Sequence, residues 1–145
     1  MKERMEYKKY PNRKLRHMLS FPFIWMMIIP LIILDVFLEV YHHICFPLYG
    51  LKKIKRKEYI KIDRHRLEYL PWYDKINCMY CGYANGLLHY ASKIAAATEA
   101  YWCAIRHQQT PSFHSPPHHR NFLAYGDEQG FRKKYGVQLN TKKKQ

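Results

Sequence analysis

Acidic residues are scarce in this chain of 145 residues, with 11 Asp and Glu against 25 Lys and Arg and a net charge of +14. This imbalance predicts an anionic partner, which is either a phospholipid surface or a nucleic acid. The chain is also too short for two independent hydrophobic cores. It therefore has room for one small domain and an anchor.

Recognisable catalytic motifs are absent. The sequence has no glycine-rich phosphate loop, no Ser-His-Asp or Cys-His-Asn order, no internal repeat and no known nucleic-acid-binding module. It therefore indicates an architecture and a site, but no reaction. Nucleic-acid binding ranks last among the possible functions, because the basic residues cluster beside an apolar segment and not on a reading helix.

Cysteines are few and lack the even spacing of a disulfide framework. The chain has four, and their arrangement argues against a secreted disulfide scaffold and for thiols kept reduced in the cytosol. Three of them lie in two short motifs, in which Cys78 precedes Cys81 by three residues and Cys103 precedes His107 by four. The remaining thiol, Cys45, lies just before a proline and is expected to be packed.

The two motifs predict a metal site. Two thiols separated by two residues can hold one ion from a tight turn, and Gly82 relieves strain after the second thiol. A Cys and a His four apart on a helix project from one face. The predicted ligands are Cys78, Cys81, Cys103 and His107, with zinc as the metal and iron as the alternative. The competing interpretation is that the cysteines are small buried apolar residues and that the histidine lies on the surface at a helix end.

A shared site depends on the 21 residues between Cys81 and Cys103. One unbroken helix would place the two motifs about 25–30 Å apart and exclude the site, because a helix rises about 1.5 Å per residue. A tight hairpin at Asn85-Gly86 followed by a helix from Ser92 would also separate them. Only an extended segment followed by a returning helix, capped near Ser92, brings the motifs together.

A basic arm, residues 1–17, leads into an apolar anchor, residues 18–50. This order is typical of a membrane-seated segment, and no small-residue cleavage site follows that would mark a signal peptide. The charge-free run is shorter than the roughly 20 residues of a spanning helix unless Asp35 is included. Basic residues 52–57 follow the anchor, so a hairpin bent at Pro30 is favoured and a single crossing is the alternative.

Acidic and imidazole side chains share one stripe of a helix that continues from the anchor. Their Glu-x-x-His spacing occurs on the helices of carboxylate-bridged di-metal bundles, and such groups need partners close to lipid. They define a second-choice metal site of Asp35, Glu39, His43 and Glu99, in which His42 can replace His43. The alternative is that they pair with neighbouring Lys or Arg.

Three further segments complete the predicted organisation. Residues 51–72 are a basic linker, residues 73–107 are the metal-binding domain, and residues 108–145 are a Pro- and His-rich loop with a basic tail. The loop histidines, His114, His118 and His119, are expected to be solvated, and weak metal binding is the alternative. Glycines interrupt the stretch from 122 to 138, which can hold at most a short helix.

Residues Cys78 to Tyr83 resemble one metal-binding knuckle of a rubredoxin, where two such knuckles hold one iron. The second knuckle is absent, and Cys103 with His107 stands in its place. This departure favours zinc over one-iron electron transfer. Residues 77–107 also resemble a family of small uncharacterised bacterial membrane-associated proteins. That resemblance implies an architecture but no activity.

Together these features predict a mostly helical protein, attached to the cytoplasmic membrane by an N-terminal helix or re-entrant hairpin. A small helical metal-binding domain follows on the cytosolic side. Anionic membrane lipids are the expected partner, and a membrane protein is a second one. The predicted function is a structural or partner-docking module. The alternatives are an iron-dependent redox protein or enzyme and, last, a basic nucleic-acid-binding protein.

Overall fold

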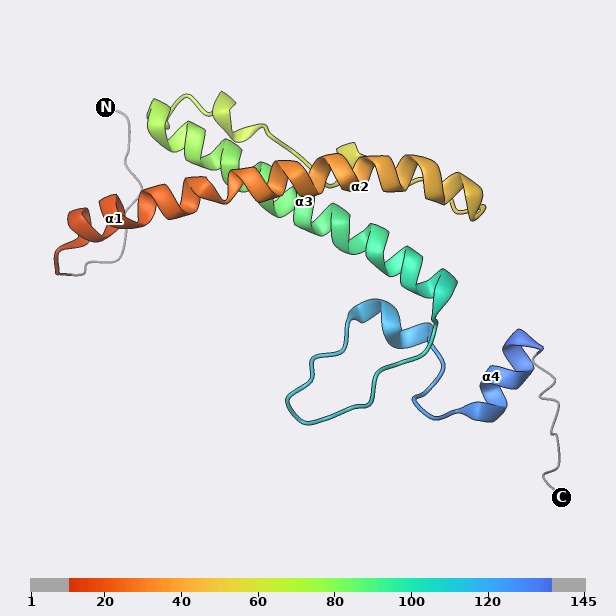
Figure 1. Cartoon of the computed structure of the whole chain (residues 1–145). Helices are drawn as coiled ribbons and strands as arrows, with labels where there is room; N and C mark the ends of the chain where they lie inside the picture. Colours follow the sequence, from red (N-terminus) through yellow and green to blue (C-terminus); the bar gives the residue numbers. More distant parts are fainter. Residues whose placement is uncertain (1–10, 137–145) are drawn as a thin grey trace, which may run out of the picture. The chain divides into compact units, whose positions relative to one another are not determined.

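The computed structural model describes residues 11–136 (Figure 1). Within this range the chain is mostly helical, as predicted, and has no β-strand apart from an isolated parallel bridge between Ile105 and Leu123. It divides into two compact units, one that extends up to Ile94 and one that begins at Ala95. This boundary falls inside the segment predicted as the metal-binding domain. Most of the basic arm and the end of the basic tail lie outside the described residues.

Two consecutive helices, α1 (Arg13–Met26) and α2 (Ile28–Leu48), form one long N-terminal helix (Figure 1). Met27 between them has helical backbone angles, and its carbonyl accepts a hydrogen bond from the N–H of Leu31. Pro30 lies in the first turn of α2, where proline is tolerated, and the helical hydrogen bond that its missing N–H leaves out coincides with the boundary at Met27. The chain therefore continues through this proline, and the predicted hairpin bent at Pro30 is wrong.

The N-terminal helix exposes most of its apolar side chains. By length and composition it can cross a membrane, and only 6% of its most apolar stretch is buried. A core helix of a soluble protein would be mostly buried. Leu31, His42 and Phe46 are the buried residues of this helix within the described part of the chain. An apolar surface of this kind calls for an apolar environment outside the unit.

A single helix of 31 residues, α3 (Trp72–Trp102), crosses α2 in the first unit (Figure 1). Its Leu87, Tyr90 and Ile94 are almost completely buried, as is Phe46 of α2. These side chains form the core of the unit. A helix in the second half of this region was predicted from its alanine-rich sequence, but Ser92 lies within the helix and does not cap it.

The linker between α2 and α3 contains two short 3-10 turns, η1 (Arg56–Glu58) and η2 (Arg64–Arg66). It lies directly on α3 at two glycines. A Cβ atom at Gly86 would lie 2.8 Å from the Ile60 Cα, and one at Gly82 would lie 2.9 Å from the Lys61 carbonyl oxygen. Only glycine leaves room for this approach. Gly82 therefore allows close packing and does not relieve strain beside a thiol turn.

The second unit has very few buried side chains. After α3 it contains the bridge at Ile105, a 3-10 helix η3 (Pro117–Asn121) and α4 (Glu128–Tyr135), which is the short helix predicted for this region. Among its described residues only Ala104, His119 and Phe122 are buried. A histidine thus lies inside a core that is too small to be secure by apolar burial alone.

Candidate metal centre

The thiols predicted to share one ion are separated by α3. Cys78 and Cys81 lie within this helix and not in a turn, and Cys103 is the first residue after it. A continuous helix places Cys103 roughly 33 Å beyond Cys81 along its axis, at about 1.5 Å per residue. The course of α3 therefore contradicts both the shared site with His107 and the rubredoxin-like knuckle. No group of three converging ligand-type side chains within residues 11–136 includes a cysteine.

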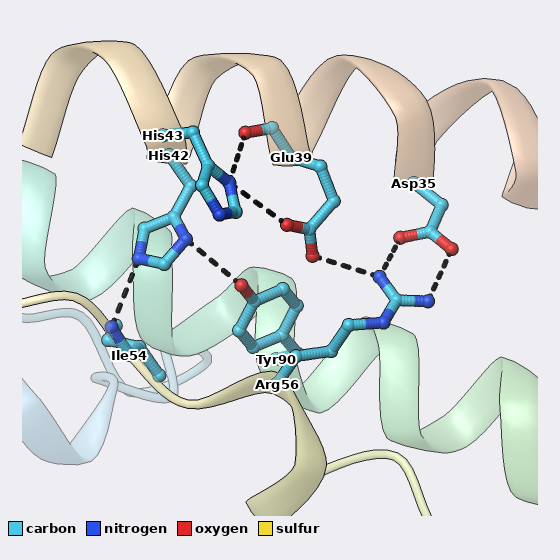
Figure 2. A network of polar contacts seen from close by, with 7 residues as sticks. All are labelled: Asp35, Glu39, His42, His43, Ile54, Arg56 and Tyr90. Atoms are coloured by element: carbon cyan, nitrogen blue, oxygen red, sulfur yellow. Dashed lines mark hydrogen bonds and ion pairs between the residues drawn. The ribbon is translucent and has the colours of Figure 1, made fainter.

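In the second-choice site, an arginine occupies the place of a metal ion (Figure 2). Arg56 Nη2 donates to Asp35 Oδ2 at 2.7 Å, and Nη1 donates to Glu39 Oε1 at 2.9 Å and to Asp35 Oδ1. The Tyr83 hydroxyl also donates to Asp35, at 2.9 Å. A guanidinium between two carboxylates repels any added cation. The alternative prediction, pairing with a nearby basic residue, is confirmed.

His42 is completely engaged in the same network (Figure 2). The N–H of Ile54 donates to its Nε2 at 3.0 Å, and the Tyr90 hydroxyl lies 3.0 Å from its Nδ1. Because a backbone N–H can only donate, Nε2 is the acceptor and the neutral ring carries its proton on Nδ1. Burial, followed by the charge of Glu39, raises the pKa of the Tyr90 hydroxyl to about 12. This tyrosine stays protonated at neutral pH.

These contacts hold the helices and the linker of the first unit together. We call the network the latch; its members are Asp35, Glu39, His42, Arg56, Tyr83 and Tyr90. His43 is exposed, and its Nδ1 lies 3.2 Å from Glu39 Oε2. Glu39, His42 and His43 do bring ligand-type atoms within 4.8 Å of one another. Both nitrogens of His42 already have partners, however, and Glu39 Oε1 accepts a hydrogen bond from Arg56. The latch joins α2, the linker and α3 in the first unit.

A second group of ligand-type side chains lies entirely in the second unit. Glu99, His107 and His119 each offer one ligand atom, and these atoms lie within 4.8 Å of one another. Glu99 is in the last turn of α3, His107 follows the bridge residue Ile105, and His119 is in η3. The end of a helix, an extended segment and a 3-10 helix therefore converge on one point.

Two imidazoles face the Glu99 carboxylate. Its Oε2 lies 2.7 Å from Nε2 of His118, and its Oε1 lies 3.0 Å from Nε2 of His119. The hydrogen bond from His118 is the main cause that lowers the pKa of the Glu99 carboxyl; burial opposes it, and the bond from His119 adds to the lowering. The carboxylate is therefore ionised at neutral pH, as a metal ligand must be.

The position of His119 is fixed from several sides. Its ring is 2% exposed and stacks on Phe122 with a centroid distance of 4.9 Å. The Arg106 side chain donates to the His119 carbonyl at 3.0 Å, and the Ser115 hydroxyl lies 3.4 Å from His119 Nδ1. Nε2 is the nitrogen directed at Glu99. For a metal to bind Nε2, Nδ1 must carry the ring proton, and it can then donate to the Ser115 hydroxyl oxygen. Such contacts hold a ligand in one orientation.

The donor set is suited to a divalent metal. Two imidazoles and one carboxylate bind catalytic zinc and non-haem iron, and leave at least one position open. His118 contacts the same carboxylate but does not belong to this group of three. His107 and Glu99 were predicted in two different sites, whereas His118 and His119 were expected to be solvated. That expectation is wrong for His119, which is buried.

Comparison with models of known protein families, with curated proteins and with solved structures found no match to this chain. The resemblance of residues 77–107 to bacterial membrane-associated proteins therefore stays a prediction. The function has to be inferred from the geometry of the two units.

Proposed function

We propose that this protein is a membrane-anchored docking module whose second unit is held together by a zinc ion bound to Glu99, His107 and His119. One observation carries the proposal: these side chains come from three separate segments, and their ligand atoms lie within 4.8 Å of one another. Convergence of this kind around a buried histidine is typical of metal centres.

The weak core of the second unit supports a structural role for the ion. Ala104, His119 and Phe122 are its only buried residues within the described range. A small domain with so little apolar burial needs an additional source of stability, and a metal provides it because binding free energy becomes folding free energy. The ion connects the end of α3 to the segments that follow it.

The N-terminal helix supports attachment to a membrane. Its apolar residues from Met18 to Leu34 are mostly exposed, and lipid is the environment that covers them. Asp35 does not oppose insertion, because its charge is neutralised by Arg56 in the latch. Basic residues lie on both sides, at 13–16 and 52–57. They favour anionic head groups of the cytoplasmic membrane at both ends of the helix. Because both ends are basic, the positive-inside rule assigns no side to a single crossing. The cytosolic position of the second unit rests on the cysteine arrangement, which indicates thiols kept reduced.

An iron-dependent redox protein is the second candidate function. Two histidines and one carboxylate with an open position form the ligand set of many non-haem iron oxygenases. The observation that favours it is the low number of protein ligands, since a structural zinc site has four. The two candidate functions differ in whether His118 binds the ion as a fourth ligand.

Metal analysis of the purified full chain tests the proposal. We expect about one zinc per chain, because Glu99, His107 and His119 form one site. Replacing His107 with Gln removes a ligand and should lower the zinc content several-fold. Cys103→Ser and His114→Gln should leave it unchanged. Stoichiometric iron would favour the redox function, and wild-type protein without metal would exclude both.

A further inference from the structure

A cavity of about 420 Å³ lies beside the metal centre in the second unit. His119 belongs to its wall and is also a proposed metal ligand. The polar side chains around it are Arg106, Gln109, Ser115 and Arg120, and no carboxylate lines it. This volume suits a small ligand. The cationic lining indicates that the ligand is an anion.

The Arg106 guanidinium is held in place without losing its charge. Its Nε donates to the His119 carbonyl at 3.0 Å, and its Nη2 donates to the Arg120 carbonyl at 2.6 Å. Both acceptors are neutral. None of the ion pairs formed within residues 11–136 joins Arg106 or Arg120 to a carboxylate. Two uncompensated positive charges therefore lie at this cavity.

We propose that the cavity binds the phosphate group of a phosphate monoester, between Arg106 and Arg120. Such a group carries about two negative charges at neutral pH and three acceptor oxygens, which match two guanidinium groups. Ser115 and Gln109 can donate further hydrogen bonds. A carboxylate, with one charge, would leave one arginine unpaired. This preference for phosphate follows from the number of charges around the cavity.

His119 belongs both to the wall of the cavity and to the candidate metal site, so a bound phosphate would lie next to the ion. His119 would bind the metal through its ring while its main chain and Arg106 border the cavity. A phosphorylated ligand would thus be held next to the ion, a placement that rests on the proposed function. The cavity and its two arginines do not depend on the proposed function. The monoester can come from a lipid head group such as phosphatidate or from a soluble compound.

Titration calorimetry with phenyl phosphate tests this inference on the full chain, as purified, in an uncharged detergent. Arg120→Gln should weaken binding about tenfold or more, because it removes a charge-assisted hydrogen bond. Arg64→Gln, which removes an equal charge from an exposed turn, should leave the affinity unchanged. Equal weakening by the two variants, equally tight binding of benzoate, or no binding by the wild-type protein would overturn the proposal.

Metal content measured in the same samples separates the two proposals. Loss of affinity in Arg120→Gln with unchanged metal supports the cavity, and absence of metal with the same loss of affinity refutes only the metal centre. Dihexanoyl phosphatidate and dihexanoyl phosphatidylglycerol then identify the source. Competition by the first alone indicates a lipid monoester, and competition by neither, with phenyl phosphate bound, indicates a soluble one.

Discussion

Replacing Arg56 with methionine is expected to lower the free energy of unfolding of the first unit by about 2–3 kcal/mol, because the carboxylates of the latch lose their cation. Asp35 is 14% exposed and Glu39 is 28% exposed. Breaking a fully buried ion pair costs about 3–5 kcal/mol, and the partial exposure of these groups reduces the effect. Denaturant unfolding in detergent measures it.

Two variants identify the cause of this loss. Lys57→Met removes a positive charge from the adjacent residue, which is exposed, and should change stability by less than about 0.5 kcal/mol. Adding Asp35→Asn to Arg56→Met should restore part of the loss, because one of the unpaired charges disappears. If Lys57→Met and Arg56→Met destabilise the protein equally, the latch shown in Figure 2 is not a structural element.

Replacing His119 with glutamine is expected to destabilise the second unit alone. A metal present at about 1,000 times its dissociation constant stabilises the folded state by about 4 kcal/mol, and this contribution disappears with the ligand. Hydrogen exchange should therefore accelerate after Ala95 while the part of the chain up to Ile94 stays protected. The chain divides into two compact units after Ile94, so the faster exchange should be confined to the second one.

A chelator provides the matching control for His119→Gln. EDTA should produce the same faster exchange in the wild-type protein and no additional change in the variant. His114→Gln, in an exposed position of the same loop, should behave like the wild type. A wild-type protein whose second unit is insensitive to EDTA would show that no metal stabilises it.

Helix content was predictable from the sequence, but the continuity of α3 was not. Alanine-rich residues near its end indicate a helix by local preference alone. Gly82 and Gly86 weaken a helix locally, and a Cys-x-x-Cys-Gly pattern fits a metal-binding turn equally well. The helix persists because the linker packs on these two glycines. This contact joins segments that are distant in the sequence, so local sequence patterns cannot predict it.

The residues of the candidate site were likewise only partly predictable from the sequence. Glu99 and His107 were recognised as ligand types, but each was assigned to partners on other segments. Their partner His119 follows Glu99 by twenty residues across a loop, and its burial depends on Phe122 and Arg106. Likewise, a charge partner for Asp35 was predicted as an alternative, whereas only the folded linker identifies it as Arg56.

X-ray absorption at the zinc edge of the full-length protein tests the metal centre most directly. The proposed ligands Glu99, His107 and His119 predict nitrogen and oxygen neighbours at about 2.0–2.1 Å, with histidine scattering that weakens in His119→Gln. A sulfur neighbour at about 2.3 Å would contradict the proposal, because it would assign the ion to the cysteines.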